Sequence, residues 1–205
     1  MRKGRLTVAY GPMFSGKTAA LAEDANRLRE IARRRVLVCM PEMDTRRSRT
    51  EIVSLSGARA TAIQVADPFQ ILTLAAETEA QEVIIDEVHF FRQTTTQDGV
   101  ESWSIVFVVK ILLQRGVNVR VAGVNTNFLG YPFPPITDLI GMADDLVRTR
   151  AICTVCGEPA DWSLRLVDGK PAGAGELIVV AGTRGEEGVA KETYEARCGR
   201  HHPFL

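Results

Sequence analysis

The chain has 205 residues, 45% of them hydrophobic, so it can bury a full core, and we expect one main domain with a small appendage. Lys and Arg together number 25, as do Asp and Glu, so the net charge is zero and no nucleic-acid partner is predicted. The basic start of the chain is followed by too short an apolar run for a signal peptide. The apolar run at 105–113 is short and contains Lys110, so no membrane span is predicted.

Short β-branched runs alternate with helical patterns along the first two thirds of the chain. The patterns predict strands at 6–10, 36–40, 83–86 and 117–124, and helices at 18–35, 68–79, 101–115 and 136–145. The run at 36–40 is apolar throughout, as expected for a parallel strand covered on both faces. This alternation predicts an α/β fold over residues 1–150, with a right-handed, mostly parallel sheet flanked by helices.

A glycine-rich loop joins the first predicted strand to the first predicted helix. Its sequence fits G-x-x-x-x-G-K-T, the loop that wraps nucleotide phosphates, whereas a chance glycine-rich turn would seldom have both flanking elements. Gly11 and Gly16 permit close backbone approach, so the loop N–H groups can converge on phosphate oxygens at a helix N-terminus. Lys17 is predicted to reach the β- and γ-phosphates, and the Thr18 hydroxyl to ligate Mg²⁺. The predicted nucleotide-binding residues are Gly11, Pro12, Met13, Phe14, Ser15, Gly16, Lys17 and Thr18.

Two carboxylates, Asp86 and Glu87, end the apolar run at 83–86. In a phosphate-loop protein such a strand-end acid holds Mg²⁺, which is the predicted role of Asp86. Glu87 then remains for acid–base chemistry on a water or a substrate hydroxyl. The alternative is a solvated pair of acids at a turn. Asp86-Glu-Val-His89 also spells a helicase box, but a helicase needs two ATPase lobes and this chain has room for one.

Metal-ligand spacing distinguishes residues 151–205, which also contain two glycine-rich stretches. Cys153-x-x-Cys156 and Cys198-x-x-His201 match a closed tetrahedral Zn²⁺ site, which would be structural because it leaves no open position. His202 is the rival ligand to His201, and two unrelated pairs, one of them redox-active, are the alternative. The site is predicted to pin a small zinc-binding domain to the main one. Because the cysteines form no disulfide framework, the cytoplasm is the expected compartment.

Taken together, these motifs resemble those of the zinc-containing type II thymidine kinases. The resemblance covers nearly the whole chain, in family order. Its pieces are the loop at 11–18, Asp44-Thr-Arg46, Ile85-Asp-Glu-Val-His-Phe-Phe91, the segment 123–133, the Cys-x-x-Cys pair, and Tyr194-Glu-Ala-Arg-Cys198 with His201.

The resemblance implies a P-loop (RecA-like) fold with a small C-terminal zinc-binding lasso domain, and transfer of the ATP γ-phosphate to the 5′-hydroxyl of thymidine, or also of deoxyuridine. It implies Glu87 as general base, Asp44 and Arg46 near the transferring phosphate, and Asp86 with Thr18 at Mg²⁺. Family members are commonly homotetramers, which we expect here. The implied nucleoside site comprises Met13, Phe91, Phe128, Phe133, the lasso residues Val179, Val180, Ala181, Gly182 and Thr183, and nearby Tyr194.

The sequence departs from the family pattern at several positions. His89 replaces a Gln, Asn125 and Asn127 replace acids, and Leu55 replaces a His. Extra residues around 184–191 lengthen the lasso. The asparagines at 125 and 127 are expected to alter subunit contacts or loop anchoring. The lasso insertion is expected to affect base preference and affinity more than the reaction, because the phosphate loop, Asp86 and Glu87 are intact. Two other functions compete with the kinase: an ATPase or GTPase without a nucleoside acceptor, and a zinc-ribbon interaction module with a degenerate nucleotide site.

Overall fold

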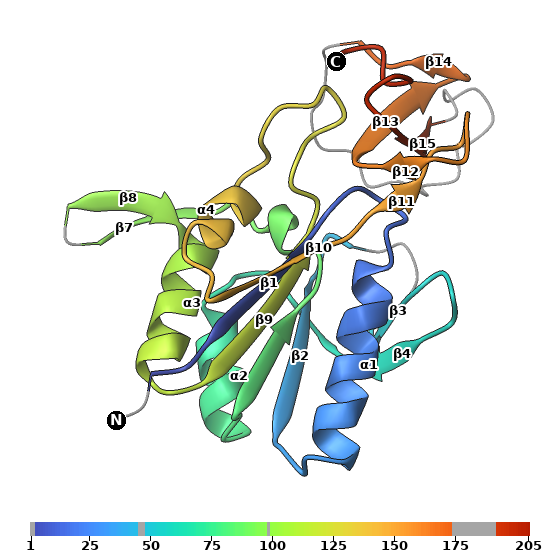
Figure 1. Ribbon diagram of the computed structural model, residues 1–205. Helices are drawn as coiled ribbons and strands as arrows, with labels where there is room; N and C mark the ends of the chain where they lie inside the picture. The colour runs from blue at the N-terminus through green and yellow to red at the C-terminus, as the bar shows by residue number, and fades with distance from the viewer. Residues whose placement is uncertain (1–2, 45–47, 98, 174–191) are drawn as a thin grey trace.

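A six-stranded sheet forms the centre of the molecule. The computed structural model describes residues 3–44, 48–97, 99–173 and 192–205. The sheet order is β10–β1–β9–β6–β2–β5, and every neighbouring pair is parallel (Figure 1). The strands are β1 (Leu6–Tyr10), β2 (Val36–Pro41), β5 (Ile63–Val65), β6 (Glu82–Ile85), β9 (Asn118–Gly123) and β10 (Asp145–Arg148). This arrangement confirms the predicted P-loop α/β fold.

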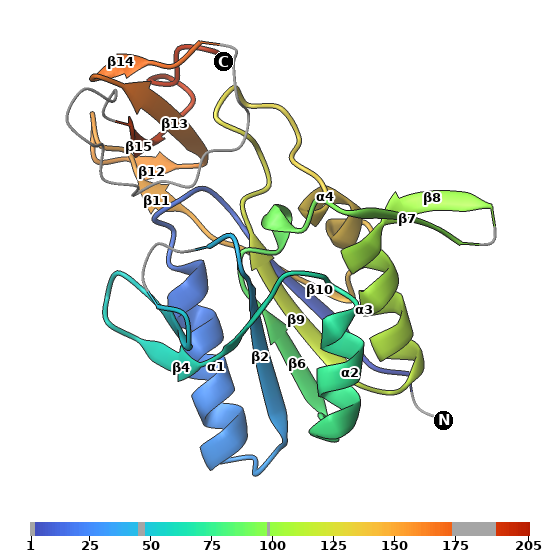
Figure 2. The ribbon, with the colours of Figure 1, turned by 180° about the vertical axis from the view of Figure 1, so that it is seen from behind.

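Helices cover both faces of the sheet. On one face lies α1 (Lys17–Glu30), with the hairpin of β3 (Glu51–Val53) and β4 (Arg59–Thr61) beside it. On the other face lie α2 (Gln70–Glu77), α3 (Ser104–Gln114) and the short α4 (Ile136–Ile140) (Figure 2). A 3-10 turn, η1 (Val88–Phe90), follows β6.

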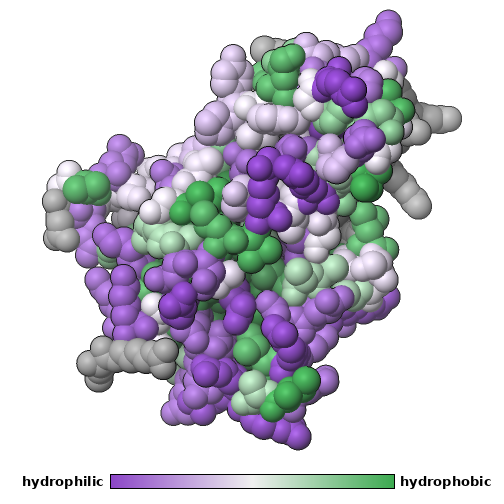
Figure 3. Space-filling view, viewed as in Figure 1, coloured by the Kyte–Doolittle hydropathy of each residue, from purple (hydrophilic) through white to green (hydrophobic). Residues whose placement is uncertain are grey.

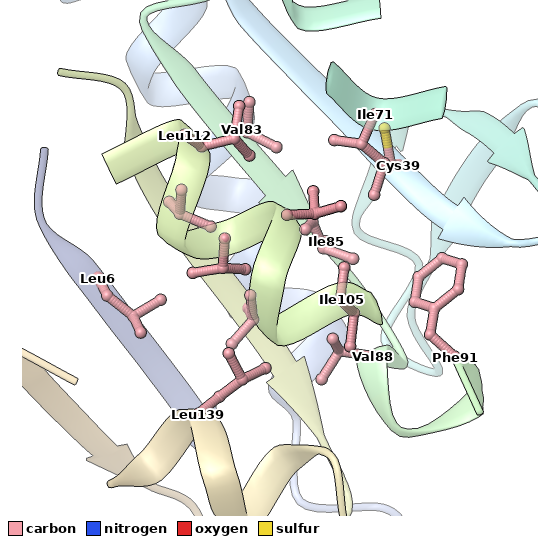
Figure 4. Close-up of a cluster of buried hydrophobic side chains, with 14 of the residues drawn as sticks. Leu6, Cys39, Ile71, Val83, Ile85, Val88, Phe91, Ile105, Leu112 and Leu139 are labelled. Carbon is pink, nitrogen blue, oxygen red and sulfur yellow. The ribbon is translucent and has the colours of Figure 1, made fainter. Parts of the chain in front are cut away.

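Alternation along the buried strands supplies a core to each face. In β6, Val83 and Ile85 point to the α3 side, where they pack with Ile105, Leu112 and their neighbours (Figure 4). Ile84 points to the opposite face and joins the core beneath α1. That second core includes Ala22 and Ala25 of α1. Burial on both faces explains why the central part of β6, at 83–85, is apolar at each position.

Three predicted helices have the wrong bounds. Residues 100–103 are not helical: β8 (Val100–Trp103) pairs with β7 (Thr94–Gln97) in a hairpin, and α3 starts only at Ser104. The helix predicted to run to 145 ends at Ile140, because Asp145 begins β10 and pairs with β1. In both places tertiary pairing overrides the local helical pattern. The first helix also ends early, at Glu30.

Residues 151–173 and 192–205, here called the C-terminal region, form two small antiparallel sheets. One contains β11 (Ala151–Ile152) and β12 (Pro159–Ala160). The other has the order β14–β13–β15, with β13 at Trp162–Val167, β14 at Lys170–Pro171 and β15 at Glu192–Arg197. Figure 1 shows the region beyond the end toward which the parallel strands point.

The face of the molecule shown in Figure 3 is mostly hydrophilic, with apolar patches. The outermost strand of the main sheet, β10, exposes Leu146 and Val147. Val100 is exposed in the β7–β8 hairpin. Among the described residues, no helix has both the length and the apolar character needed to cross a membrane.

Candidate active site

The phosphate loop connects β1 to α1, as predicted. Its two glycines are required for different reasons. A Cβ at Gly11 would lie 2.3 Å from the carbonyl oxygen of Thr149, so only glycine fits there. Gly16 has open space around it but a φ of 85°, in the left-handed region that other residues adopt only with strain. Phe14, between them, also has a positive φ of 65° and is half exposed.

Lys17 folds back over the loop that precedes it. Its ammonium donates hydrogen bonds to the carbonyl oxygens of Pro12 at 2.6 Å and Gly11 at 3.0 Å, and to Ser15 Oγ at 3.2 Å. The side chain is buried. A buried cation inside a loop at a helix N-terminus is suited to binding phosphate.

Asp86 lies at the carboxyl end of β6, with its carboxylate directed at the start of α1. It accepts hydrogen bonds from the Thr18 hydroxyl and, at 2.9 Å, from the Glu87 N–H. Burial, together with the negative charge of Glu87, raises the pKa of Asp86 to about 7, although these hydrogen bonds and the charge of Lys17 oppose the shift. A buried carboxylate beside a hydroxyl offers the hard oxygen ligands that Mg²⁺ prefers.

Glu87 turns the chain into η1 with a positive φ of 49°. Its Oε2 lies 3.4 Å from Nδ1 of His89. The same ring nitrogen lies 3.3 Å from the N–H of Val124, which donates to it from the end of β9. The His89 ring also packs against Phe133, with centroids 5.4 Å apart. The carboxylate of Glu87 is therefore flanked by a buried imidazole rather than by open solvent.

A cavity of about 300 Å³ brings most of the predicted catalytic residues together. Its lining includes loop residues 13–18, Asp44, Asp86 and Glu87. The opposite wall is the β3–β4 hairpin, at residues 51–56, which the sequence reasoning missed. Ser56-Gly57, shortly after the β-branched pair Ile52-Val53, was the turn signal that could have revealed this hairpin.

The residues predicted to hold the nucleoside are more dispersed. Met13 lines the cavity, but the three phenylalanines and Tyr194 are not among its described lining residues. Phe91 is 1% exposed and packs in the core on the α3 side (Figure 4), and Phe128 is buried beneath the Arg165 guanidinium. Their nucleoside role stays a prediction. Arg46 and residues 179–183 lie outside the described residues.

Four side chains in the C-terminal region form a group that could hold a metal ion. The ligand atoms of Cys153, Cys156, Cys198 and His201 all lie within 4.8 Å of one another. Cys156 and Cys198 Sγ are 3.8 Å apart, and His201 Nδ1 lies 3.7 Å from Cys153 Sγ and 3.3 Å from Cys198 Sγ. A tetrahedron with Zn–S bonds of about 2.3 Å has edges of about 3.8 Å, so the spacing fits zinc.

The electrostatics of this cluster also favour a cation. Burial raises the pKa of the Cys153 thiol, but hydrogen bonds from backbone N–H groups and from His201 outweigh it and lower that pKa to about 5. The thiolate, which is the form that binds metal, is therefore favoured at neutral pH. The rival ligand His202 lies outside the cluster, where its Nε2 donates to the carbonyl oxygen of Ser163 at 3.4 Å.

Comparison with known proteins gives a consistent result over nearly the full length. A family model described as thymidine kinase matches residues 4–202. A thymidine kinase from Thermococcus kodakarensis is 38% identical over 206 residues, which cover 97% of this chain and 94% of that protein. A thymidine kinase from Coprothermobacter proteolyticus is also 38% identical, over 199 residues covering 97% of this chain and 90% of the relative. The resemblance inferred from the motifs is confirmed.

Proposed function

The chain belongs to the thymidine kinase family, and from this premise we propose that it transfers the γ-phosphate of ATP to the 5′-hydroxyl of thymidine, giving dTMP for nucleotide salvage. One observation carries the proposal. A single cavity is lined by the phosphate loop, by the hydrogen-bonded pair of Thr18 and Asp86, and by a further carboxylate, Glu87. Phosphoryl transfer to an alcohol requires positioned phosphates, a metal site and a base.

The triphosphate would be bound by the loop N–H groups and by Lys17, which would exchange its loop carbonyl partners for phosphate oxygens. Thr18 and Asp86 would hold Mg²⁺, which neutralises charge that builds up on the phosphate oxygens. Asp44 lines the same cavity, and with Arg46 it would lie near the transferring phosphate. In this arrangement Asp86 is an ionised metal ligand, and it does not take the proton from the nucleoside hydroxyl.

Glu87 would accept the proton of the 5′-hydroxyl as the oxygen attacks. Its side chain is 13% exposed, so it reaches the cavity while remaining shielded from bulk water. A carboxylate that faces the cavity can accept a proton from a hydroxyl bound there. The contact with His89 Nδ1 limits the directions in which this carboxylate can point.

The nucleoside would lie between Met13 and the residues carried over from the family. These are Phe91, Phe128, Phe133 and Tyr194, with the lasso residues 179–183 holding the polar edge of the base. The rings of Phe128 and Phe133 each pack against an arginine side chain. The guanidinium carbon of the arginine lies 5.4 Å from the ring centroid of Phe128 and 5.5 Å from that of Phe133. Deoxyuridine is the nearest further acceptor.

We assign zinc to the cluster of Cys153, Cys156, Cys198 and His201, in a structural role because all four positions are protein ligands. The division into an ATP-binding domain at 1–150 and a zinc-binding lasso domain at 151–205 is part of the same proposal. A set of three reduced cysteines also favours the cytoplasm as compartment.

A homotetramer is the proposed assembly. This proposal is supported by β10, an edge strand of the main sheet, which exposes Leu146 and Val147. An unpaired sheet edge with apolar side chains is suited to self-association. Light scattering on the eluted protein would measure the mass, and a monomer at micromolar concentration would refute the assembly.

A phosphoryl-transfer assay with labelled ATP across the common nucleosides tests the reaction. We expect label at the 5′ position of thymidine, and of deoxyuridine to a lesser extent. The family comparisons do not favour an ATPase or GTPase without an acceptor, nor a zinc-ribbon module with a degenerate nucleotide site. ATP turnover that is independent of thymidine would support the ATPase, and no turnover with Mg²⁺ and any nucleoside would support the binding module.

A further inference from the structure

The phosphate loop is held from outside by two hydroxyl side chains that come from far along the chain. The Met13 N–H donates to Oγ of Ser163 at 2.9 Å, and Ser15 Oγ lies 2.7 Å from Oγ1 of Thr149. Ser163 belongs to β13, and Thr149 lies between β10 and β11. The two contacts span 150 and 134 residues of sequence.

We propose that Ser163, in the C-terminal region, and Thr149, in the segment that leads into it, are positioning residues that hold the phosphate loop in its nucleotide-binding shape. The inference rests on the proposed ATP-binding role of the loop and is independent of which nucleoside is the acceptor. Neither hydroxyl needs to touch ATP, because each acts through a loop residue.

The Thr149 contact fixes the start of the loop. Thr149 donates its N–H to the carbonyl oxygen of Tyr10 at 2.8 Å, and its Oγ1 lies 3.1 Å from the same oxygen. Its own carbonyl is the group against which Gly11 packs. Ser15 Oγ, in turn, donates to the Pro12 carbonyl at 2.8 Å and receives the Lys17 ammonium. Thr149 therefore connects both ends of the loop with the lysine inside it.

The Ser163 contact connects the loop to the predicted zinc cluster. Ser163 is 2% exposed and pairs with Ala196 of β15, two residues before Cys198. Ala196 shares a small core with Cys153 and Cys198. On the other side, the Ser163 carbonyl accepts the hydrogen bond of His202, the neighbour of His201. Residues next to two of the predicted ligands, Cys198 and His201, therefore fix the position of Ser163, and through it the Met13 amide.

The physical consequence concerns phosphate affinity. A phosphate loop binds because several N–H groups are arranged in advance around one anion, so small displacements weaken several hydrogen bonds together. Loss of one tethering hydrogen bond is expected to weaken ATP binding by about 3–10-fold, the range of one net hydrogen bond.

The test uses the full-length, zinc-loaded protein without nucleoside. Calorimetry measures the Kd for a non-hydrolysable Mg·ATP analogue in Ser163→Ala and Thr149→Val, which each remove a hydroxyl with little change of shape. Amide hydrogen exchange resolved at Met13 provides a readout besides activity. We expect weaker analogue binding in both variants and faster Met13 exchange in Ser163→Ala, with Ser163→Thr restoring both properties.

The matched control is Ser104→Ala, because Ser104 is equally buried, 2% exposed, but lies at the start of α3. It should leave the Kd and the Met13 exchange unchanged. Zinc content and melting temperature show whether the C-terminal region of each variant is folded. Should Ser163→Ala lose its zinc, Thr149→Val decides, because Thr149 lies outside both antiparallel sheets.

Coupling to the cluster is tested by removing zinc with a chelator from wild type and from Ser163→Ala. Zinc removal should weaken analogue binding by wild type by about the same factor as the Ser163→Ala substitution does in the zinc-loaded protein. Zinc removal from Ser163→Ala should weaken its binding by a smaller factor. The inference would be overturned if zinc removal weakened analogue binding equally in wild type and Ser163→Ala, or if both hydroxyl variants bound the analogue with wild-type affinity. If wild type itself bound no analogue, the proposed function would fail instead.

Discussion

The phosphate loop and the C-terminal region, which meet at Met13 and Ser163, derive their shape from different sources. The loop follows a buried strand and begins a helix that packs on a large sheet with a core on each face. The C-terminal region has a core of only five described residues, two of them cysteines of the proposed zinc cluster. We therefore expect apolar burial to stabilise the first region and a bound metal ion to stabilise the second.

The largest effect is expected from a change in the metal cluster. Cys153→Ser should lower zinc content from about one per chain to near zero. It should also abolish hydrogen-exchange protection in β13 and β15, because binding free energy at such sites is folding free energy. The parallel strands β1, β6 and β9 should keep their protection, since their cores contain no ligand. Metal analysis and peptide-level hydrogen exchange measure both quantities.

Cys39→Ala is the matched control. Cys39 is completely buried in β2, and burial raises the pKa of its thiol to about 12, so it does not behave as a metal ligand. Its loss should cost about 1–2 kcal/mol of stability through the cavity that remains, with normal zinc content. Simultaneous loss of protection in the main sheet of Cys153→Ser would show that the two regions do not have separate sources of stability.

The second prediction concerns the chemical step, which depends on the main sheet rather than on the zinc. Glu87→Gln should lower kcat by roughly 10²–10⁴ with little change in ATP affinity, the range for losing a general base. Steady-state kinetics with thymidine and a binding titration with an ATP analogue separate the two quantities.

Glu51→Gln offers a control within the same cavity, because Glu51 is a carboxylate on the hairpin wall. Its kcat should stay within about threefold of wild type, since the residue has no proposed role in proton transfer. A near-normal kcat in Glu87→Gln would remove Glu87 from the role of base.

The third prediction separates the two glycines of the loop. Gly11→Ala should weaken ATP binding and lower stability by about 1–3 kcal/mol, because its new Cβ must push the Thr149 carbonyl away. Gly16→Ala meets no atom within 4 Å, so its cost should be about 1 kcal/mol, from the left-handed φ alone. Urea melts and analogue titrations measure both, and equal costs would contradict the packing of Thr149 against the loop.

The contrast between the regions also explains which features the sequence could predict. The phosphate-loop sequence, the strand before Asp86 and the cysteine spacings are local patterns with a direct physical reason. The structure confirms the loop between β1 and α1, the strand, and the grouping of the cysteines with His201. The hydroxyls of Thr149 and Ser163 could not be found in this way, because their partners lie more than 130 residues away. Residues 101–103 are predicted as the start of a helix but belong to β8, because the pairing of β7 with β8 outweighs the local helical pattern.

The last prediction is a pH dependence centred on Asp86. Its pKa in the folded state is raised to about 7, from an ordinary value of 3.8, mainly by burial. Below pH 7 the carboxyl carries a proton that Mg²⁺ must displace, so the affinity for Mg·ATP analogue should fall by up to about tenfold between pH 8 and pH 6. Without the metal the sign for stability is the reverse. The folded state holds this proton more tightly than the unfolded state, so the Asp86 contribution destabilises the fold increasingly as pH rises from about 4 to about 7. Thermal melts in the absence of Mg²⁺ should therefore show a drop over this interval that Asp86→Asn lacks. Parallel pH profiles for the two proteins would mean that Asp86 ionises as freely in the fold as in water, and would remove burial as the feature that tunes this metal site.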